Sequence, residues 1–185
     1  MTWDGALTGT PNAAYQASKK YAEKAAWNVV EKEKPKFDLV TLNPPMVYGP
    51  LRHSISSVKQ LNESNARIYN LFINSSKDVP LPPNGLPVYT DVRDIALAHI
   101  KAAMVPEASG HMFVICYGQV SSQEISDLLR KNIPELEERT PVGVPGGNKL
   151  DPDYYTASNA LAKKVLRMTF RPKEETFVEL AKQLR

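Results

Sequence analysis

The chain has 185 residues, of which 42% are hydrophobic and 23% charged, and its formal net charge is +3. This length corresponds to about one globular domain with a sizeable core, and the mildly basic balance without a dense Lys/Arg stripe argues against nucleic acid as a partner. A single cysteine, Cys116, excludes an internal disulfide framework and fits a reducing compartment, so we expect a cytoplasmic protein. No apolar run reaches the ~18 residues of a membrane span, and no secretory signal is expected.

The first predicted elements are a helix and a strand. The helix covers residues 13–33, because five alanines favour it and Lys34-Pro35 ends it. The run 37–43 is apolar and β-branched and is stopped by two prolines, which predicts a buried parallel strand. A second helix is expected from Ser57 to Ile73, followed by a Pro/Gly-rich loop.

The second half continues the alternation of strands and helices, without internal repeats. A short strand at 88–90 leads into a helix that Asp91 caps, with Asp94 at the third helical position. The run 110–116 predicts a strand that buries the Cys116 thiol, and Ser121 or Ser122 caps the next helix. After a loop-rich region at 134–156, Ser158 is expected to cap a short helix, and 173–185 forms the terminal helix.

Several kinds of catalytic site are not indicated. The three histidines are not spaced as ligands, and no Cys/His/acid cluster resembles a metal site, so no metal is expected. The chain contains neither a G-x-S-x-G nor a P-loop motif. Gly146-Gly147 lies in a proline-bearing loop with no strand before it, which predicts a turn rather than a dinucleotide fingerprint.

Tyr15 and Lys19 are four residues apart in the first helix, so they lie one above the other on one face. A chain with this many tyrosines and basic residues can contain such a pair by chance, and both side chains could simply be solvated. The chemistry is nevertheless reasonable. An ammonium one turn away stabilises a phenolate, so the phenol could protonate a carbonyl oxygen while hydride reaches the carbon. The strand that follows would end beside this helix, where ligands of open α/β sheets bind.

Four blocks in order make the chain resemble the extended short-chain dehydrogenase/reductases. They are YQASKKYAEKAAW (15–27), LNPPMVYGP (42–50), YTDVRDIALAH (89–99) and PVGVPG (141–146). Within this family, which includes epimerases and dehydratases, the blocks are most similar to fungal NADPH-dependent ketone and methylglyoxal reductases and to plant dihydroflavonol reductases. The resemblance implies an α/β fold: an incomplete Rossmann-like, doubly wound sheet plus a smaller α/β substrate-binding region.

The resemblance also implies roles for matching residues. Tyr15 resembles the catalytic acid/base, and Lys19 the residue that tunes it and hydrogen-bonds the nicotinamide ribose. Pro44, Pro45, Met46 and Val47 resemble the segment that lies along the nicotinamide. Ser64 is similar to a serine that contacts the cofactor, which would be NADP(H). The TDVRD block resembles a structural block, so Asp91 and Arg93 are expected to be scaffold.

Full members of this family carry a Gly-rich strand-turn-helix for the pyrophosphate and a catalytic Ser or Thr ahead of the Tyr, and this chain contains neither. Residues 1–50 are therefore expected to be the remnant of a dinucleotide-binding domain, and 51–185 mainly a substrate-binding region with segments that return to the sheet. We expect an NADPH-dependent reductase of small ketones or aldehydes that is inactive alone. The alternatives are a non-catalytic remnant that binds a small ligand or a full-length relative, and a nucleotide-sugar epimerase or dehydratase. An uncovered strand at 37–43 predicts self-association or pairing with the absent half.

Overall fold

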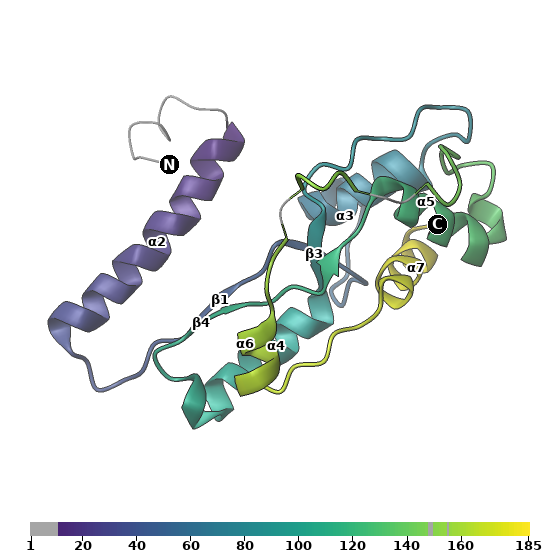
Figure 1. Cartoon of the computed structure of the whole chain (residues 1–185). Coiled ribbons are helices and arrows are strands. Elements are labelled where there is room, and N and C mark those ends of the chain that lie inside the picture. The colour runs from purple at the N-terminus through teal and green to yellow at the C-terminus, as the bar shows by residue number, and fades with distance from the viewer. Residues whose placement is uncertain (1–10, 148–149, 155) are drawn as a thin grey trace.

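The structure is a computed structural model that describes residues 11–147, 150–154 and 156–185. Figure 1 labels the main elements. In chain order they are α2 (Pro11–Glu33), β1 (Thr41–Asn43), β2 (Met46–Tyr48), η1 (Val58–Gln60), α3 (Glu63–Ile68), η2 (Tyr69–Ile73), β3 (Val88–Asp91), α4 (Val92–Met104), η3 (Pro106–Ala108), β4 (Met112–Val114), β5 (Gly118–Gln119), α5 (Ser122–Asn132), η4 (Pro134–Leu136), α6 (Ala160–Val165) and α7 (Lys173–Leu184).

Two small sheets, both with parallel pairs, organise the described residues. In the first, β1 pairs in parallel with β4, with Leu42 opposite Phe113. In the second, β2 pairs in parallel with β3, and β3 pairs antiparallel with β5. Helices lie between the parallel partners along the chain, as the crossover connections of parallel strands require. The Rossmann-like α/β expectation is confirmed.

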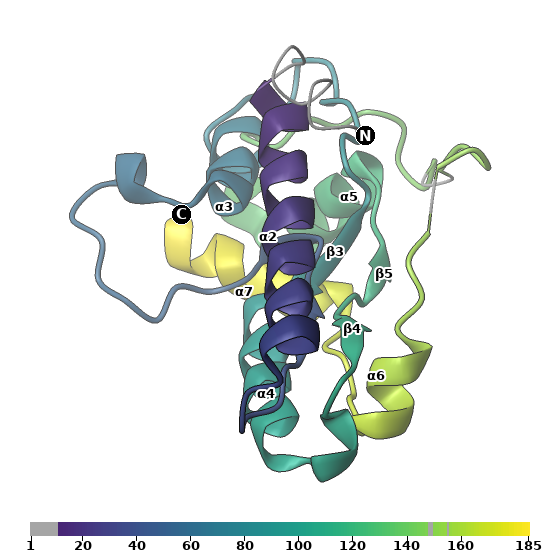
Figure 2. The same cartoon turned by 90° about the vertical axis from the view of Figure 1, so that its left-hand side faces the viewer.

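Helices cover the β1–β4 sheet on both sides. Figures 1 and 2 show α2 as a layer of its own on one side, with α4 and α6 on the other. The side toward α4 and α6 is the apolar one, because Phe113 of β4, Leu42 of β1 and the preceding Val40 pack there. The buried members of this cluster are Ile95, Ala98, Ala108, Phe113, Ile115, Ala162, Leu166 and Met168.

A second core lies between the three-stranded sheet and helices α3, α5 and α7. Its centre is aromatic: the ring of Phe177 in α7 lies 5.2 Å from the rings of both Tyr48 and Tyr89. Tyr89 is fully buried, and burial raises the pKa of its hydroxyl above the ordinary value. The aromatic contacts therefore join β2, β3 and the terminal helix into one packed unit.

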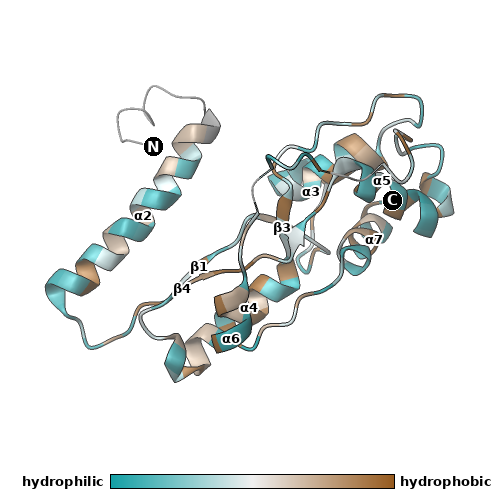
Figure 3. Ribbon diagram, in the orientation of Figure 1, coloured by the Kyte–Doolittle hydropathy of each residue, from teal (hydrophilic) through white to brown (hydrophobic). Residues whose placement is uncertain are grey.

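Helix α2 packs less tightly than the other long helices. Of its described side chains only Ala17 is fully buried, and Figure 3 shows hydrophobic residues on it only in short patches. The helix ends as predicted: Lys34 adopts the left-handed conformation (φ 45°), and its N–H donates to the carbonyl of Val30. Such a residue caps a helix, and Pro35 prevents its continuation.

The predicted helix from Ser57 to Ile73 is wrong as a single element. Ser57 caps only the short turn η1, where its hydroxyl accepts from the N–H of Lys59. Leu61 and Asn62 are extended, with ψ angles of 140° and 154°, so the chain breaks before α3 begins. The last part, η2, is a π-helical turn rather than an α-helix. Local preference favoured a continuous helix, and the extended pair at 61–62 overrides it.

Two predicted strands are shorter than expected. The strand expected at 37–43 is regular only at β1 and half-buried rather than buried, and Phe37 is 63% exposed. The strand expected at 110–116 is regular only at β4, although Cys116 is fully buried as predicted and burial raises the pKa of its thiol. Among the described residues, β1 and β4 pair only with each other, so each strand is regular only over the residues that its partner pairs with.

The caps are mostly as predicted. Asp91 accepts from the N–H of Arg93, and Ser121 forms a reciprocal capping box with Glu124. Ser158 differs: Asn159 occupies the N-cap of α6, and its amide donates to the carbonyl of Cys116 at 2.7 Å. This long-range bond fixes Asn159 and leaves the Ser158 hydroxyl 3.4 Å from the N–H of Ala160.

Candidate active site

Tyr15 and Lys19 lie on one face of α2, as the spacing predicts. The Lys19 ammonium lies 5.2 Å from the centre of the Tyr15 ring. Tyr15 is 62% exposed, so its hydroxyl is accessible to a ligand in the described structure. The arrangement holds a phenol beside a cation, which is the pairing that acid–base chemistry requires. The catalytic role of both residues stays a prediction.

Glu23 fastens this helix to the strand that follows it. Its carboxylate accepts from the Thr41 hydroxyl at 2.7 Å and from the Asn43 amide at 3.2 and 3.3 Å. The Trp27 indole N–H lies 3.4 Å from the same carboxylate. Because side chains alternate along a strand, Thr41 and Asn43 face α2 while Val40 and Leu42 face the apolar core.

The segment expected along the nicotinamide forms the link between β1 and β2 and then β2 itself. Pro44 is exposed and Pro45 half-buried, while Met46 and Val47 are half-buried strand residues. Gly49 directly follows the strand, and its φ of +134° and close approach to Val92 leave no room for a side chain: a Cβ would lie 2.9 Å from Val92 Cγ1.

Ser64 is brought to the same end of β2. It is half-buried in the first turn of α3, and its neighbour Asn65 donates to the carbonyl of Gly49 at 2.9 Å. The Asn65 Oδ1 atom is buried and has no hydrogen-bond partner among the described residues. The hydrogen bond therefore holds α3 against the end of the predicted nicotinamide segment.

The predicted residues form two groups that do not touch. Tyr15 and Lys19 make one group, and Pro44–Val47 with Ser64 make the other. Within residues 11–147, 150–154 and 156–185, no hydrogen bond, ion pair or ring contact joins them. Helix α2 reaches the sheet through Glu23, two turns after Tyr15, and Figure 1 shows its first turns standing clear of the sheet.

One cavity lies away from this chemistry. It is an open groove of about 620 Å³ between Leu42 of β1, with Val40 just before the strand, and the end of α4, where Met104 and Val105 contribute. It thus opens on the apolar side of β1, opposite Glu23. A second cavity, of about 530 Å³, is lined by residues of β5, α5 and α7 and by residues between 150 and 154 together with Thr156, and contains none of the predicted site residues. No cluster of metal-binding side chains occurs in the described part of the chain.

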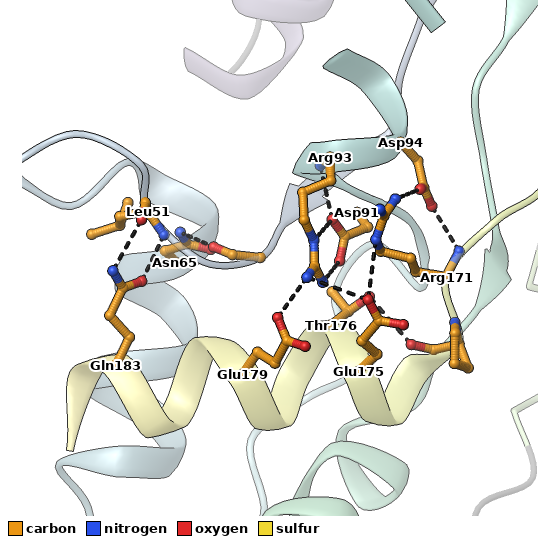
Figure 4. A network of polar contacts seen from close by, with 12 residues as sticks. Leu51, Asn65, Asp91, Arg93, Asp94, Arg171, Glu175, Thr176, Glu179 and Gln183 are labelled. Carbon is orange, nitrogen blue, oxygen red and sulfur yellow. Dashed lines mark hydrogen bonds and ion pairs between the residues drawn. The ribbon is translucent and has the colours of Figure 1, made fainter. Parts of the chain in front are cut away.

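Asp91 and Arg93 belong to a polar network between α4 and α7, drawn in Figure 4. Asp91 is fully buried, and the Arg93 guanidinium donates to it through Nε at 2.9 Å and Nη2 at 2.8 Å. Burial raises the pKa of Asp91, but the hydrogen bonds from the Arg93 side chain and backbone outweigh it, so the pKa lies below its ordinary value. Arg93 also pairs with Glu175 and Glu179 of α7.

A second pair extends this network. Arg171 pairs with Asp94 through its guanidinium and its backbone N–H, and with Glu175 at 3.1 Å. Asp94 therefore binds a residue outside its own helix. Burial of the Asp94 carboxyl outweighs the bonds from Arg171 and raises its pKa. These ion pairs join β3, α4, α7 and the segment before α7, and their residues line neither of the two cavities above, which indicates a structural role.

The family is established by comparison with known proteins. Residues 3–116 match the model of the NAD dependent epimerase/dehydratase family. The chain belongs to this family. Its resemblance to the extended short-chain dehydrogenase/reductases is thereby confirmed.

Relatives of this family member carry reductase names. It is 40% identical over 172 residues to the ketoreductase azaE of Aspergillus niger, covering 92% of this chain and 50% of that protein. It is 34% identical over 187 residues to the NADPH-dependent methylglyoxal reductase GRE2 of Saccharomyces cerevisiae, covering 99% and 54%. The crystal structure of yeast methylglyoxal/isovaleraldehyde reductase Gre2 complexed with NADPH superposes with a TM-score of 0.86 at 32% identity, covering 100% of this chain and 54% of that one. The chain therefore spans about half the length of these relatives.

Sequence reasoning missed Glu23, Thr41 and Asn43. The signal was present in the strand, because Thr41 and Asn43 are polar residues two apart in a run otherwise read as apolar. Such alternation indicates a strand with one polar face. Nothing in the sequence pairs that face with Glu23, which precedes Thr41 by 18 residues.

Proposed function

We propose that this chain supplies the acid–base pair and part of the nicotinamide site of an NADPH-dependent carbonyl reductase. The observation that carries the proposal is the Tyr15–Lys19 pair, held on one exposed helix face with 5.2 Å between the ammonium and the ring. The names of the relatives, a ketoreductase and a methylglyoxal reductase, support a ketone or aldehyde as substrate. With one buried thiol and no disulfide, the protein would work in a reducing compartment, and we propose the cytoplasm.

The position of α2 along the sheet supports this pairing of residues. Figure 1 shows α2 and β1 running in opposite directions, so the N-terminal turns of α2 extend beyond the carboxyl end of β1. Tyr15 precedes Glu23 by eight residues, about 12 Å of helix. Met46 follows Asn43 by three residues, about 10 Å of extended chain. These two lengths support placing Tyr15 and Met46 at similar heights along the sheet, although no hydrogen bond, ion pair or ring contact joins the two residues in the described structure.

The nicotinamide end of NADPH fits the residues that are present. Ser64 and the unpaired Oδ1 of Asn65 provide polar atoms beside β2, and Lys19 would provide the cation that the family resemblance assigns to the nicotinamide ribose. When bound, the cofactor supplies the hydride. The Tyr15 hydroxyl gives its proton to the carbonyl oxygen as the carbonyl carbon is reduced, which leaves an alcohol and a phenolate. The Lys19 ammonium stabilises that phenolate until it regains a proton from water.

The phosphate end does not fit the described residues, because they contain no Gly-rich turn leading into a helix. We propose that a second α/β part completes the site by adding a strand to the free edge of β1. Among described residues β1 pairs only with β4, and the groove of about 620 Å³ beside Val40 and Leu42 leaves apolar surface uncovered. Parallel sheets are normally buried on both faces, and the part of GRE2 that this chain does not match has the size for that role.

The test is a chimera in which this chain replaces the matching part of GRE2, called the GRE2 chimera below. NADPH oxidation is followed at 340 nm with methylglyoxal as substrate, and NADPH binding is followed by fluorescence. We expect the chimera to bind NADPH and turn over, and the isolated chain to do neither. Turnover by the isolated chain would refute the need for a second part. A folded chimera that binds NADPH without turnover would refute the catalytic proposal and favour a non-catalytic role.

A further inference from the structure

One carboxylate carries most of the described polar attachment of α2 to the sheet. Glu23 accepts from Thr41 and Asn43 of β1, at distances of 2.7 to 3.3 Å. The Trp27 indole, one turn further along α2, donates to the same carboxylate and limits the directions that the side chain can adopt. Hydrogen bonds to a charged acceptor are worth about twice those between neutral groups.

Apolar packing does not replace this attachment. Of the described α2 side chains only Ala17 is fully buried, and Val29, near the end of the helix, is 52% exposed. A helix held mainly by apolar burial can rotate or slide by small steps among similar packings, whereas hydrogen bonds to two fixed strand residues specify one register. Thr41 and Asn43 are fixed because β1 is paired with β4.

The same stripe of α2 carries the proposed catalytic pair. Tyr15, Lys19 and Glu23 follow one another at intervals of four residues. Eight residues rotate the helix by a net angle of about 80°, so all three lie on one side of α2. Fixing Glu23 on β1 therefore also fixes which side of α2 Tyr15 and Lys19 present toward the carboxyl end of the sheet.

We infer that Glu23 is a positioning residue that sets the rotation and height of α2 for carbonyl reduction. The inference rests on the function proposed above. Glu23 touches neither substrate nor cofactor in this account, so it acts only through the placement of the Tyr15 hydroxyl and the Lys19 ammonium. A displacement of about 1 Å of such groups can cost about 100-fold in rate.

The test uses Glu23→Ala, the partly conservative Glu23→Gln, and Glu31→Ala as a matched control. Glu31 is an exposed glutamate of the same helix with no described contact. Hydrogen exchange of α2 amides is measured by mass spectrometry on the isolated chain. In the GRE2 chimera, kcat and the KM for NADPH are measured separately. We expect Glu23→Ala to speed exchange in α2 and to lower kcat about 10- to 100-fold while the KM changes by less than about twofold.

The variants should form an ordered series. Glu23→Gln keeps an acceptor for the Thr41 hydroxyl, so it should recover part of the lost kcat, and Glu31→Ala should match the unsubstituted chimera. An unchanged kcat together with lower stability would show a merely structural role and overturn the inference. If the unsubstituted chimera has no turnover, the proposed function fails first. Hydrogen exchange in the isolated chain then tests the positioning role of Glu23. If the α2 amides exchange at the same rate in Glu23→Ala as in the unsubstituted chain, the inference is overturned.

Discussion

Arg93 offers the sharpest prediction of stability. Replacing Arg93 by alanine removes two hydrogen bonds from its guanidinium to Asp91, at 2.8 and 2.9 Å. The Asp91 carboxylate then stays buried, and its remaining partners are the backbone N–H of residue 93 and the Thr176 side chain. Removing one partner of a buried ion pair costs about 3–5 kcal/mol. We expect about 3 kcal/mol, because the Arg93 side chain is 16% exposed and water can partly replace it.

The assay is urea unfolding of the isolated chain at pH 7, supported by thermal melting. A loss of about 3 kcal/mol corresponds to a decrease in Tm of roughly 6–12 °C for a chain of this length. Glu179→Ala is the matched control, since it removes a pair between Arg93 and a side chain that is 46% exposed. That change should cost less than about 1 kcal/mol.

The pH dependence tests the physical reason. With Arg93 present, the pKa of Asp91 lies below its ordinary value, so the folded state favours the carboxylate more than the unfolded state does. The stabilisation is therefore complete above the unfolded pKa of about 3.9 and is lost as the pH falls through the folded pKa. Without Arg93 burial dominates and raises the pKa of Asp91. The variant's deficit should therefore be largest at pH 7 and shrink as the pH falls, first through the raised pKa of Asp91 in the variant and then through its lowered pKa in the unsubstituted chain. A deficit under about 1 kcal/mol at pH 7, or one independent of pH, would refute this reasoning.

Three further predictions concern packing, the terminal helix and association. Phe177→Ala should cost about 3–5 kcal/mol in urea unfolding, because Phe177 is fully buried against two aromatic rings, and a cost under about 1 kcal/mol would contradict the assigned core. Gln183→Ala, which removes two hydrogen bonds to the backbone of Leu51 near the molecular surface, should cost only about 1 kcal/mol in the same assay, and a loss near that of Phe177→Ala would show the bonds to be more important than their exposure suggests. The isolated chain should self-associate at tens of micromolar in sedimentation through the edge of β1 that no described strand covers, and Leu42→Lys should reduce that association; a monomer in both cases would exclude it.

Elements whose signals are local were predictable from the sequence. The alanines of α2, the prolines after β1 and the caps at Asp91 and Ser121 act through neighbours within four residues, and these elements are found where they were expected. The shared face of Tyr15 and Lys19 follows for the same reason, because helical spacing alone determines it.

Features that depend on distant partners were not predictable in the same way. The break at Leu61 and Asn62 precedes an α3 whose Asn65 bonds to Gly49, 16 residues earlier in the chain. The attachment of Glu23 to Thr41 spans 18 residues and depends on how α2 meets β1. A single sequence does not show which distant segments come into contact, and such tertiary contacts decide between local structures of similar energy.

Tyr15→Phe tests the central claim most directly. This substitution removes the hydroxyl and nothing else from the GRE2 chimera, and Tyr21→Phe makes the same change at another tyrosine of α2. The account predicts that Tyr15→Phe lowers kcat for NADPH-dependent methylglyoxal reduction by about 10²- to 10⁴-fold, with NADPH still bound, and that Tyr21→Phe stays close to the unsubstituted chimera. A Tyr15→Phe chimera that keeps the full kcat would contradict the assignment of Tyr15 as the proton donor.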